Sequence, residues 1–550
     1  MTLYPIAEKQ QNGVLILSLI LLFSLFIRIF FFNGEFGSDE VVYLIRSLDV
    51  TNWHWSSSNY NGALRYGYNI PSGLFIYLFG LNMFTANLWP LLCSLVEISL
   101  VFLFSWKYIN HKAALFSALL LAFLPLHVAV STRLHADPVV SMFLTLSFVS
   151  FYKAELESSR RMYFLTGIFL GCVFWVKELV SVTFFTFLLY PIFIRKIKWI
   201  WLYLVSGALV MLLTHFALME FIAGDPLHAI TTVMGQMKRG LHDASRYEDS
   251  PLYYFKYLFF DIKHTWLTPL LALLAIPTFS NSTTLTRGKD GLKYAIFWLV
   301  SLLVVLSFFP VSLAPLRFAM KQSNYITLFL APIAIIAGAA LTAIPRKIAY
   351  LLTAITLSGG LFLSALEQQD YRVFTANSRA LLVFSDNHPN QDIYGSVNNG
   401  RIGCFHQVIN GKDCNSSKIH NFTEIPTDTS VSSDTTVFAV IDRETLDWGI
   451  HDKKISNVPT CWHEIETIVP ASIGNSHFIL DIILMVTKLM PTNVARKFEE
   501  LQNPKPAKIY TTTLANIWCD SADKKSSSPK SMDEVDPQHM QPSAIFTKIQ

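Results

Sequence analysis

The chain has 550 residues, of which 52% are hydrophobic and only 15% are charged. The apolar share is too high, and the charged share too low, for an ordinary soluble protein. The net charge of +4 is small and spread along the chain, so nothing indicates nucleic-acid binding. No GxxxxGK(S/T) phosphate loop is present, so ATP-driven chemistry is not indicated. Many windows of roughly 18–20 residues carry few charges, which predicts a polytopic helical membrane protein.

Eleven apolar stretches of the chain are candidate membrane-spanning helices. They lie at residues 13–33, 84–106, 113–131, 138–153, 162–176, 179–194, 199–221, 265–280, 294–312, 325–344 and 348–366. The first is about 20 residues long and has no obvious small-residue cleavage site, so we interpret it as a retained anchor. The predicted fold class is a membrane all-α protein with about eleven transmembrane helices.

Basic residues in alternate connections predict the orientation of these spans. With the N-terminus in the cytoplasm, every cytoplasmic connection is basic. These connections contain Lys107/Lys112, Lys153/Arg160/Arg161, Arg195/Lys196/Lys198, Arg287/Lys289/Lys293 and Arg346/Lys347. The C-terminal region then lies on the extracytoplasmic side. We expect a bacterial inner (plasma) membrane, with the endoplasmic reticulum as the alternative.

Outside the spans, the sequence predicts interfacial helices and a second, smaller domain. Residues 71–80, in the first outer loop, are too short to cross easily and predict a helix lying in the membrane interface. The predicted organisation is a transmembrane domain over 1–366, a small extracytoplasmic α/β domain over 367–520 and a disordered tail over 521–550. Within the second domain we expect strands at 392–397 and 436–441, turns at 398–400 and 410–411, and a buried or interfacial helix at 478–490.

Four of the six cysteines, Cys404, Cys414, Cys461 and Cys519, fall in the polar C-terminal region. In a non-cytosolic domain they are able to form two disulfides with three connectivities, and unpaired thiols are the alternative. No CxxC pair and no zinc-type spacing is present.

Polar side chains recur at the extracytoplasmic ends of the predicted spans. They are Asp39 and Glu40 after the first span, Arg133, His135 and Asp137 between the third and fourth, Lys177 and Glu178 between the fifth and sixth, and Arg317 and Lys321 between the ninth and tenth. The inner ends hold mostly the basic residues that the orientation rule explains. This asymmetry predicts a site that faces outward.

A lipid-linked phosphate donor would require such an arrangement. Its phosphate needs Lys or Arg near the interface for binding and for stabilising the departing charge. The acceptor hydroxyl or amine needs a carboxylate as general base. Two adjacent carboxylates can differ in pKa, so that one acts as base while the other hydrogen-bonds or holds a metal. A divalent cation therefore stays open as a cofactor, and no other cofactor is indicated.

Each polar cluster also has a simpler interpretation. Asp39-Glu40 suits the N-cap and first turn of a helix over 40–48, and Asp137-Pro138 suits a helix start. Lys177-Glu178 suits a solvated outer turn, and the two basic residues after the ninth span suit headgroup anchors. A metal site on His135 alone is weakly supported. The recurrence of such clusters at one membrane depth favours the catalytic interpretation.

The order of these motifs resembles a known enzyme family. A span is followed by Asp39-Glu40-x-x-Tyr43, then by Arg65-Tyr66-Gly67 with Pro71, then by Arg133-x-x-x-Asp137-Pro138 opening a span and Lys177-Glu178 closing one. This order is similar to the lipid-phosphate-dependent glycosyltransferases of the C superfamily. It is most similar to the branch that contains protein O-mannosyltransferases and the aminoarabinose transferases of lipid A. The resemblance covers about residues 10–350.

The resemblance implies an inverting sugar transfer from a polyprenyl-phosphate donor on the outer face. It implies Asp39 as the catalytic acid with Glu40 beside it, Asp137 as a second acid, and Lys177 with Arg317 as phosphate contacts. Tyr43, Arg65, Tyr66, Arg133, His135, Glu178 and Lys321 complete the expected substrate-binding set. Where the lipid A enzymes carry a Lys-Pro-Pro element, this chain has Arg65-Tyr-Gly-Tyr-Asn-Ile-Pro71. The acceptor, whether protein, lipid or glycan, is therefore left open.

The main alternative from another class is a membrane transporter or a lipid-linked sugar flippase. It predicts ionisable residues at mid-span and matching half-helices broken by Gly or Pro. Arg28, Glu97 and His215 are the main ionisable residues within predicted spans, and no internal repeat is evident. A membrane scaffold for the C-terminal domain would not need acids and bases gathered at one face.

Overall fold

The computed structural model describes most of the chain. The described residues are 4–242, 248–260, 262–275, 288–425, 435–448, 455, 457–469, 504–514 and 517–518, with single positions 481, 485, 492 and 496. The predicted tail over 521–550 lies outside the described residues, as does the predicted helix over 478–490 apart from two single positions.

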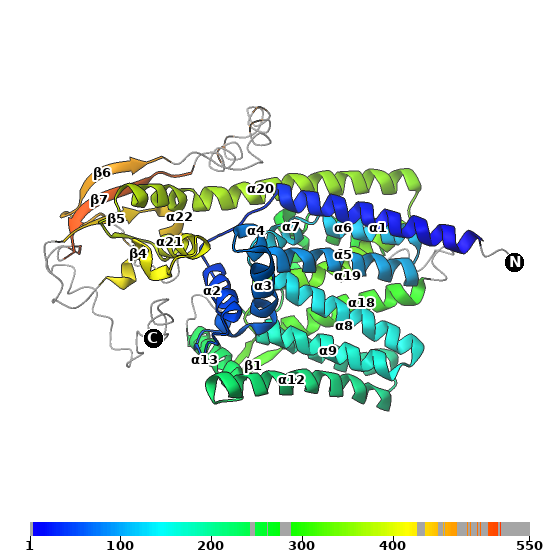
Figure 1. Cartoon of the computed structure of the whole chain (residues 1–550). Coiled ribbons are helices and arrows are strands. Elements are labelled where there is room, and N and C mark those ends of the chain that lie inside the picture. Colours follow the sequence, from blue (N-terminus) through cyan, green and yellow to red (C-terminus); the bar gives the residue numbers. More distant parts are fainter. Residues whose placement is uncertain are drawn as a thin grey trace.

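Long helices run side by side to form the body of the molecule (Figure 1). They are α1 (Tyr4–Phe30), α5 (Leu88–Tyr108), α6 (His111–Ala122), α8 (Asp137–Glu157), α9 (Arg160–Val176), α12 (Leu202–Ala223), α18 (Lys289–Phe308), α19 (Thr327–Leu341) and α20 (Arg346–Asn387). Their apolar side chains meet in one large core, in which α19 is buried along its whole length. A helix that is apolar all round belongs at the centre of such a bundle.

Seven described helices are long and apolar enough to cross a membrane, and the number rises to eight if α6 and α7 (Pro125–Ser131) form one broken span. These two helices meet at an angle of 59°, where Pro125 begins the second. The predicted all-α membrane fold is confirmed. The expected span over 179–194 is split into η2 (Glu178–Thr183), α10 (Phe184–Leu188) and α11 (Tyr190–Ile194). The span expected over 265–280 is described only as far as α15 (Ile262–Thr265) and α16 (Thr268–Leu273).

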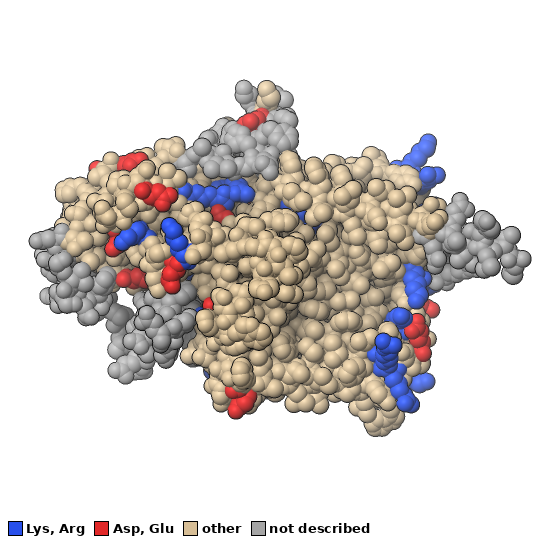
Figure 2. Space-filling model, viewed as in Figure 1, with Lys and Arg blue, Asp and Glu red and all other residues tan. Residues whose placement is uncertain are grey.

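On the visible surface of the helical bundle, the charged residues lie at its two ends. Figure 2 shows Lys and Arg, with a few Asp or Glu among them, gathered at the end near the N-terminus, while the visible side of the bundle between the ends is almost free of charge. Both signs of charge appear at the opposite end. An uncharged band between two charged ends is what a bilayer requires.

Two helices of the first outer loop cross the direction of the spans at the end far from the N-terminus (Figure 1). They are α2 (Glu40–Thr51) and α3 (Tyr66–Phe79), followed by the single turn α4 (Met83–Ala86). The interfacial helix expected over 71–80 is thus part of α3. The other outer segments are α13 (His228–His242), α14 (Tyr253–Phe260), the hairpin of β1 (Pro310–Leu313) and β2 (Leu316–Phe318), and η5 (Ser323–Ile326).

The C-terminal region forms a five-stranded sheet in the order β4-β3-β5-β7-β6. The strands are β3 (Ile393–Gly395), β4 (Ile419–Asn421), β5 (Thr436–Ile441), β6 (His463–Ile468) and β7 (Ala507–Thr513). Strand β3 pairs in parallel with β4 and β5, whereas β7 pairs antiparallel with β5 and β6. The helices α21 (Val397–Ile409) and α22 (Arg443–Trp448) accompany the sheet. Both predicted strands are present as β3 and β5.

Two local expectations changed in the C-terminal region. Residues 398–400, expected as a turn, lie inside α21 because Ser396 and Asn399 form a reciprocal capping box at its start. The boundary expected at residue 366 falls inside α20, which continues without a break to Asn387. The turn at 410–411 is present, with Gly411 at a φ of 74°. Cys404 and Cys414 form a disulfide, and Cys461 is also disulfide-bonded.

Candidate active site

Asp39 stands at the start of α2 with its carboxylate open to solvent. It occupies the N-cap position, yet its side chain makes no capping hydrogen bond. Instead, Tyr60 donates its hydroxyl to Oδ1 at 2.5 Å, and Arg65 Nη1 lies 3.9 Å from Oδ2. The Asp39 side chain is 40% exposed. Burial and the neighbouring Asp39 raise the pKa of Tyr60 well above its ordinary value, which keeps this phenol a donor.

Glu40, the first residue of α2, is turned the other way and bonds to the backbone just before the helix. Its carboxylate accepts a hydrogen bond from the backbone N–H of Ser38 at 2.8 Å, and the residue is 2% exposed. Burial raises the pKa of Glu40 above its ordinary value, while the positive charge of Arg133 opposes the shift. The two adjacent acids therefore differ: Glu40 fixes the helix start, and Asp39 is accessible.

Arg65, in the first outer loop, interacts electrostatically with the carboxylates of both Asp39 and Glu178. Its guanidinium donates to the Tyr43 hydroxyl and leaves Nε without a hydrogen-bond partner. Burial alone would lower the pKa of Arg65, but Tyr43, Glu178 and Asp39 together raise it. Glu178 is buried, and neither oxygen of its carboxylate has a hydrogen-bond partner among the described residues. We call Asp39, Tyr43, Tyr60, Arg65 and Glu178 the outer site.

Asp137 is the centre of a second, closely bonded cluster. Lys177 Nζ lies 2.9 Å from Oδ1, and His135 Nδ1 lies 2.5 Å from Oδ2. Asn324 of η5 donates to Oδ2 at 3.2 Å. Lys177 also lies over the ring of Tyr325, 4.6 Å from its centre. Three donors hold the buried Asp137 carboxylate, so both its charge and its hydrogen-bonding capacity are already used.

Arg133 connects these clusters to the segment before α2. Its guanidinium lies over the rings of Phe36 and Tyr371, at 5.6 and 4.7 Å from their centres. Its positive charge acts on Glu40. Arg133 therefore holds the approach to α2 through cation–π contacts.

The remaining predicted residues bond to groups other than Asp39. The Tyr66 hydroxyl exchanges hydrogen bonds with the backbone of Ser56, at 3.1 and 3.2 Å. Arg317 of β2 pairs with Asp249 at 3.4 Å. Lys321 donates to the carbonyls of Leu306 and Ser307 at the end of α18, at 2.7 and 2.9 Å. Such bonds to the last carbonyls of a helix stabilise its C-terminus.

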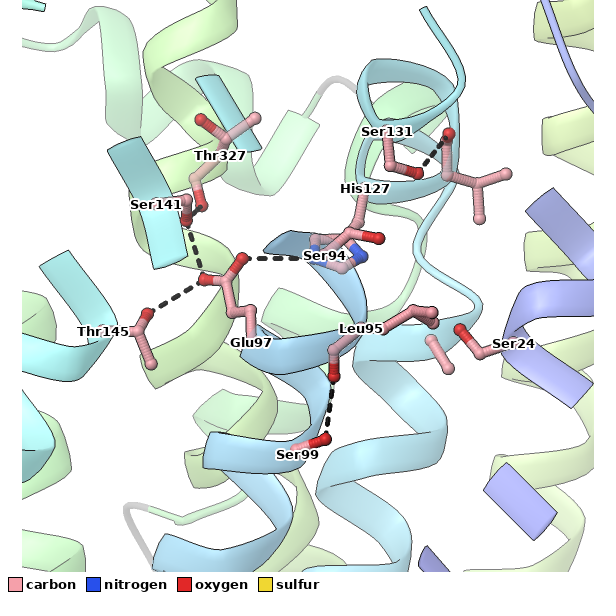
Figure 3. A network of polar contacts seen from close by, with 12 residues as sticks. Ser24, Ser94, Leu95, Glu97, Ser99, His127, Ser131, Ser141, Thr145 and Thr327 are labelled. Carbon is pink, nitrogen blue, oxygen red and sulfur yellow. Dashed lines mark hydrogen bonds and ion pairs between the residues drawn. The ribbon is translucent and has the colours of Figure 1, made fainter. Parts of the chain in front are cut away.

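Another polar cluster lies within the bundle, where Glu97 of α5, His127 of α7 and two hydroxyl side chains of α8 point toward one another (Figure 3). His127 Nε2 lies 3.2 Å from Glu97, whose other oxygen accepts from Ser141 and Thr145 at 2.7 and 2.9 Å. Arg28 approaches His127 Nδ1 to 2.7 Å. A guanidinium only donates, so Nδ1 accepts and Nε2 donates to Glu97. We call these five residues the buried network.

Sequence reasoning identified Arg28 and Glu97 only as separate ionisable residues, and it missed His127, Tyr60 and Asn324. All three lie far in sequence from the carboxylates that they contact. A polar residue in an apolar stretch was the available signal for His127. In the part of the chain that the structure describes, no group of three or more His, Cys, Asp or Glu side chains is arranged to hold a metal ion.

Comparison with known proteins finds a family model that matches part of the chain and solved structures with a similar fold. Residues 72–218 match the family model of dolichyl-phosphate-mannose-protein mannosyltransferases. No curated protein sequence matches the chain significantly. Among solved structures, ArnT from Cupriavidus metallidurans in the apo state superposes with a TM-score of 0.53 at 14% identity, covering 83% of this chain and 96% of that one.

The same ArnT bound to undecaprenyl phosphate gives a TM-score of 0.51 at 15% identity, covering 80% of this chain and 94% of that one. The archaeal oligosaccharyltransferase AglB from Archaeoglobus fulgidus gives a TM-score of 0.44 at 12% identity, covering 76% and 65%. The chain is an integral membrane protein that shares the fold of ArnT. The family resemblance predicted from the sequence is thereby confirmed.

Proposed function

We propose that this protein is an integral membrane glycosyltransferase. It transfers a sugar, hexosyl or pentosyl, from a polyprenyl-phosphate donor to an acceptor on the extracytoplasmic face, with inversion at the anomeric carbon. The observation that carries the proposal is the accessible Asp39 carboxylate beside the partly unpaired Arg65. A base and a phosphate-binding cation at one outer site are the two groups that this transfer requires.

Asp39 is the general base of the proposed reaction. Its exposed carboxylate takes the proton of the acceptor hydroxyl or amine as the acceptor atom forms its bond to the anomeric carbon. The bond from that carbon to the phosphate oxygen breaks, and its electron pair leaves on the polyprenyl phosphate. Glu40 supports this assignment indirectly, because its carboxylate is buried and committed to Ser38. Tyr60 holds the Asp39 carboxylate in place.

Arg65 and Arg317 are the proposed contacts for the phosphate. Arg65 lies next to Asp39 and has an N–H without a partner, and a guanidinium matches the geometry of phosphate oxygens. Arg317 is one-third exposed on the β1–β2 hairpin. Lys177 is already paired with Asp137, so we assign this pair an indirect role, in which it stabilises the binding site for the head of the donor. Tyr43 completes the set by fixing Arg65.

The orientation of the protein follows from its charges and its cysteines. Lys and Arg gather at the end of the bundle near the N-terminus, which supports a cytoplasmic location for that end (Figure 2). The Cys404–Cys414 disulfide supports an oxidising compartment for the C-terminal domain. We therefore propose that the outer site and the C-terminal domain are extracytoplasmic, in a bacterial inner membrane. We propose a transmembrane domain over 1–366 and an extracytoplasmic domain over 367–520, with the unbroken helix α20 running from one into the other.

The test is a transfer assay with purified protein in lipid nanodiscs and a panel of radiolabelled polyprenyl-phosphate sugars. Release of polyprenyl phosphate that depends on an added protein, lipid or glycan acceptor supports the proposal. The anomeric configuration of the product, read by NMR, tests inversion. Binding of the lipid-linked sugars without cleavage, accompanied by their movement between leaflets of a vesicle, would instead support a flippase.

A further inference from the structure

The segment that leads to Asp39 lies against α20 where this helix extends beyond the bundle. Gln368 donates to the carbonyls of Phe30 and Phe32, each at 3.2 Å, and Arg372 donates to Phe32 at 2.9 Å. About two helical turns beyond Arg372, Arg379 pairs with Glu35 at 2.8 Å. Residues 30–35 are therefore bonded along one side of α20 before the chain reaches α2.

Helix α21 of the C-terminal region bonds to the next two residues of this segment, Phe36 and Gly37. Asn398 donates its side-chain amide to the carbonyl of Phe36 at 2.7 Å and to that of Gly37 at 3.1 Å. Gly37 has a φ of 80°, and a Cβ at this position would come within 2.3 Å of the Asn398 amide nitrogen. This close approach requires glycine. The bonded carbonyls precede Asp39 by two and three residues.

Asn398 is itself held by the interior of the C-terminal region. Ser378 of α20 donates to its carbonyl oxygen at 3.4 Å. The neighbouring Asn399 donates to Ser378 at 2.7 Å and to the buried carboxylate of Asp442 at 3.1 Å. A continuous set of hydrogen bonds thus leads from the end of β5 through α21 to the backbone beside Asp39. Such a network transmits position because each member has a defined partner.

Apolar contacts fix α21 over α2 at the same place. Phe405 and Val408 of α21 pack with Val41, Leu44 and Ile45 of α2 in one buried cluster. Of the two cysteines in the Cys404–Cys414 disulfide, Cys404 is buried in this cluster and Cys414 packs against it. The C-terminal region therefore contacts both the start of α2 and its buried face.

We propose that Asn398 is a positioning residue for the base, so that the C-terminal domain forms part of the frame of the active site. The inference rests on the proposed function, because it takes Asp39 as the reacting group. The two hydrogen bonds from Asn398 set the backbone at Phe36 and Gly37, and this backbone determines where the Asp39 carboxylate stands. Displacement of a catalytic group by about 1 Å lowers a rate by roughly 100-fold.

The test compares two substitutions of Asn398 with matched substitutions of Asn410 on the same helix. Asn410 is exposed and its side chain bonds only to the carbonyl of His406 in its own helix. Asn398→Ala removes both hydrogen bonds and should lower kcat about 10-fold. Asn398→Asp keeps the shape but sets an acceptor against two carbonyl oxygens, and should lower kcat roughly 100-fold. Asn410→Ala and Asn410→Asp should retain the wild-type kcat. KM for the donor should change by less than about 3-fold in all four variants.

Hydrogen exchange of the peptide over residues 33–43 provides a readout that is independent of activity. In Asn398→Ala this peptide should exchange about 10-fold faster than in the wild type, while peptides from α5 and α19 stay unchanged. Faster exchange with an unchanged kcat would overturn the positioning role. Unchanged exchange of the peptide would also overturn it. Full activity of Asp39→Asn measured in parallel would overturn the proposed function instead, whatever the result at Asn398.

Discussion

The outer site and the buried network both contain acids and bases within an apolar molecule, but they differ in how completely these groups are paired. In the buried network, the Glu97 carboxylate accepts from three side chains, and Arg28 donates to Ser24, Ser94 and His127. In the outer site, the Glu178 carboxylate and the Nε of Arg65 have no hydrogen-bond partner among the described residues, and the Asp39 side chain is exposed. The same residue types are thus saturated in one place and incompletely bonded in the other.

This difference distinguishes a network that stabilises helix packing from a site that is able to bind a ligand. Buried charges within a bilayer are costly unless they are paired, so the saturated network serves to fix α1, α5, α7 and α8 against one another. An incompletely paired site has hydrogen-bonding capacity left for a ligand. Of the three ionisable residues within the predicted spans, Arg28 and Glu97 are here joined through His127, whereas neither ring nitrogen of the buried His215 has a hydrogen-bond partner among the described residues.

The largest effect is expected at Asp39. Asp39→Asn removes the base and should lower kcat about 10³-fold or more. The melting temperature should stay within about 2 °C of the wild type, because the carboxylate is exposed and makes no cap. Steady-state transfer assays and thermal unfolding in detergent measure the two quantities. Normal turnover of a correctly inserted Asp39→Asn protein would refute the assignment.

The next largest effect is a loss of stability in the buried network, with catalysis retained. Glu97→Ala leaves Arg28 and His127 without their acid and should cost about 3–5 kcal/mol of unfolding free energy. The protein that remains folded should turn over normally. Ser99→Ala on the same helix is the control, because Ser99 bonds only to Leu95 of its own helix. The double variant Arg28→Met/Glu97→Met should be more stable than Glu97→Ala, because it leaves no unpaired charge. The contrary result would contradict the pairing.

A smaller effect is expected at Arg65. Arg65→Lys keeps the charge but loses the planar fork, and it should lower kcat/KM about 10-fold, mainly through a higher KM for the donor. Arg46→Lys is the matched control on α2, where Arg46 pairs with Asp49 at 2.6 Å. Equal losses in the two variants would show a general effect on the loop and would argue against a phosphate contact at Arg65.

The smallest effect is a pH dependence at Lys321. Burial lowers the pKa of Lys321 to about 8, against the opposing charges of Asp249 and Glu248. The unfolded chain keeps the ordinary higher pKa, so between the two values it binds more protons than the folded protein. Stability should therefore rise with pH through this window. The melting temperature of the wild type should increase by a few degrees relative to Lys321→Met between pH 8 and pH 10. A falling difference would contradict the shift.

Hydrophobic patterning was sufficient to predict the membrane fold, and the spacing of polar residues was sufficient to locate most of the candidate site. The sequence predicts both Asp39 and Arg65 as site residues, and the two side chains do lie together. The sequence did not distinguish Asp39 from Glu40, because adjacent residues share every local feature. The direction of each side chain separates them: Glu40 reaches back to Ser38, and Asp39 faces Tyr60.

The sequence by itself determined the class of protein, because crossing a bilayer imposes long apolar helices with charges at their ends. It also places the acids and bases at the ends of apolar stretches, since each follows or precedes one. Only the tertiary structure decided which of these groups are bonded to one another. Hydrogen bonds such as His127 to Glu97 and Asn398 to Gly37 join residues 30 and 361 positions apart. No local pattern encodes such a pairing, because it depends on how the helices pack.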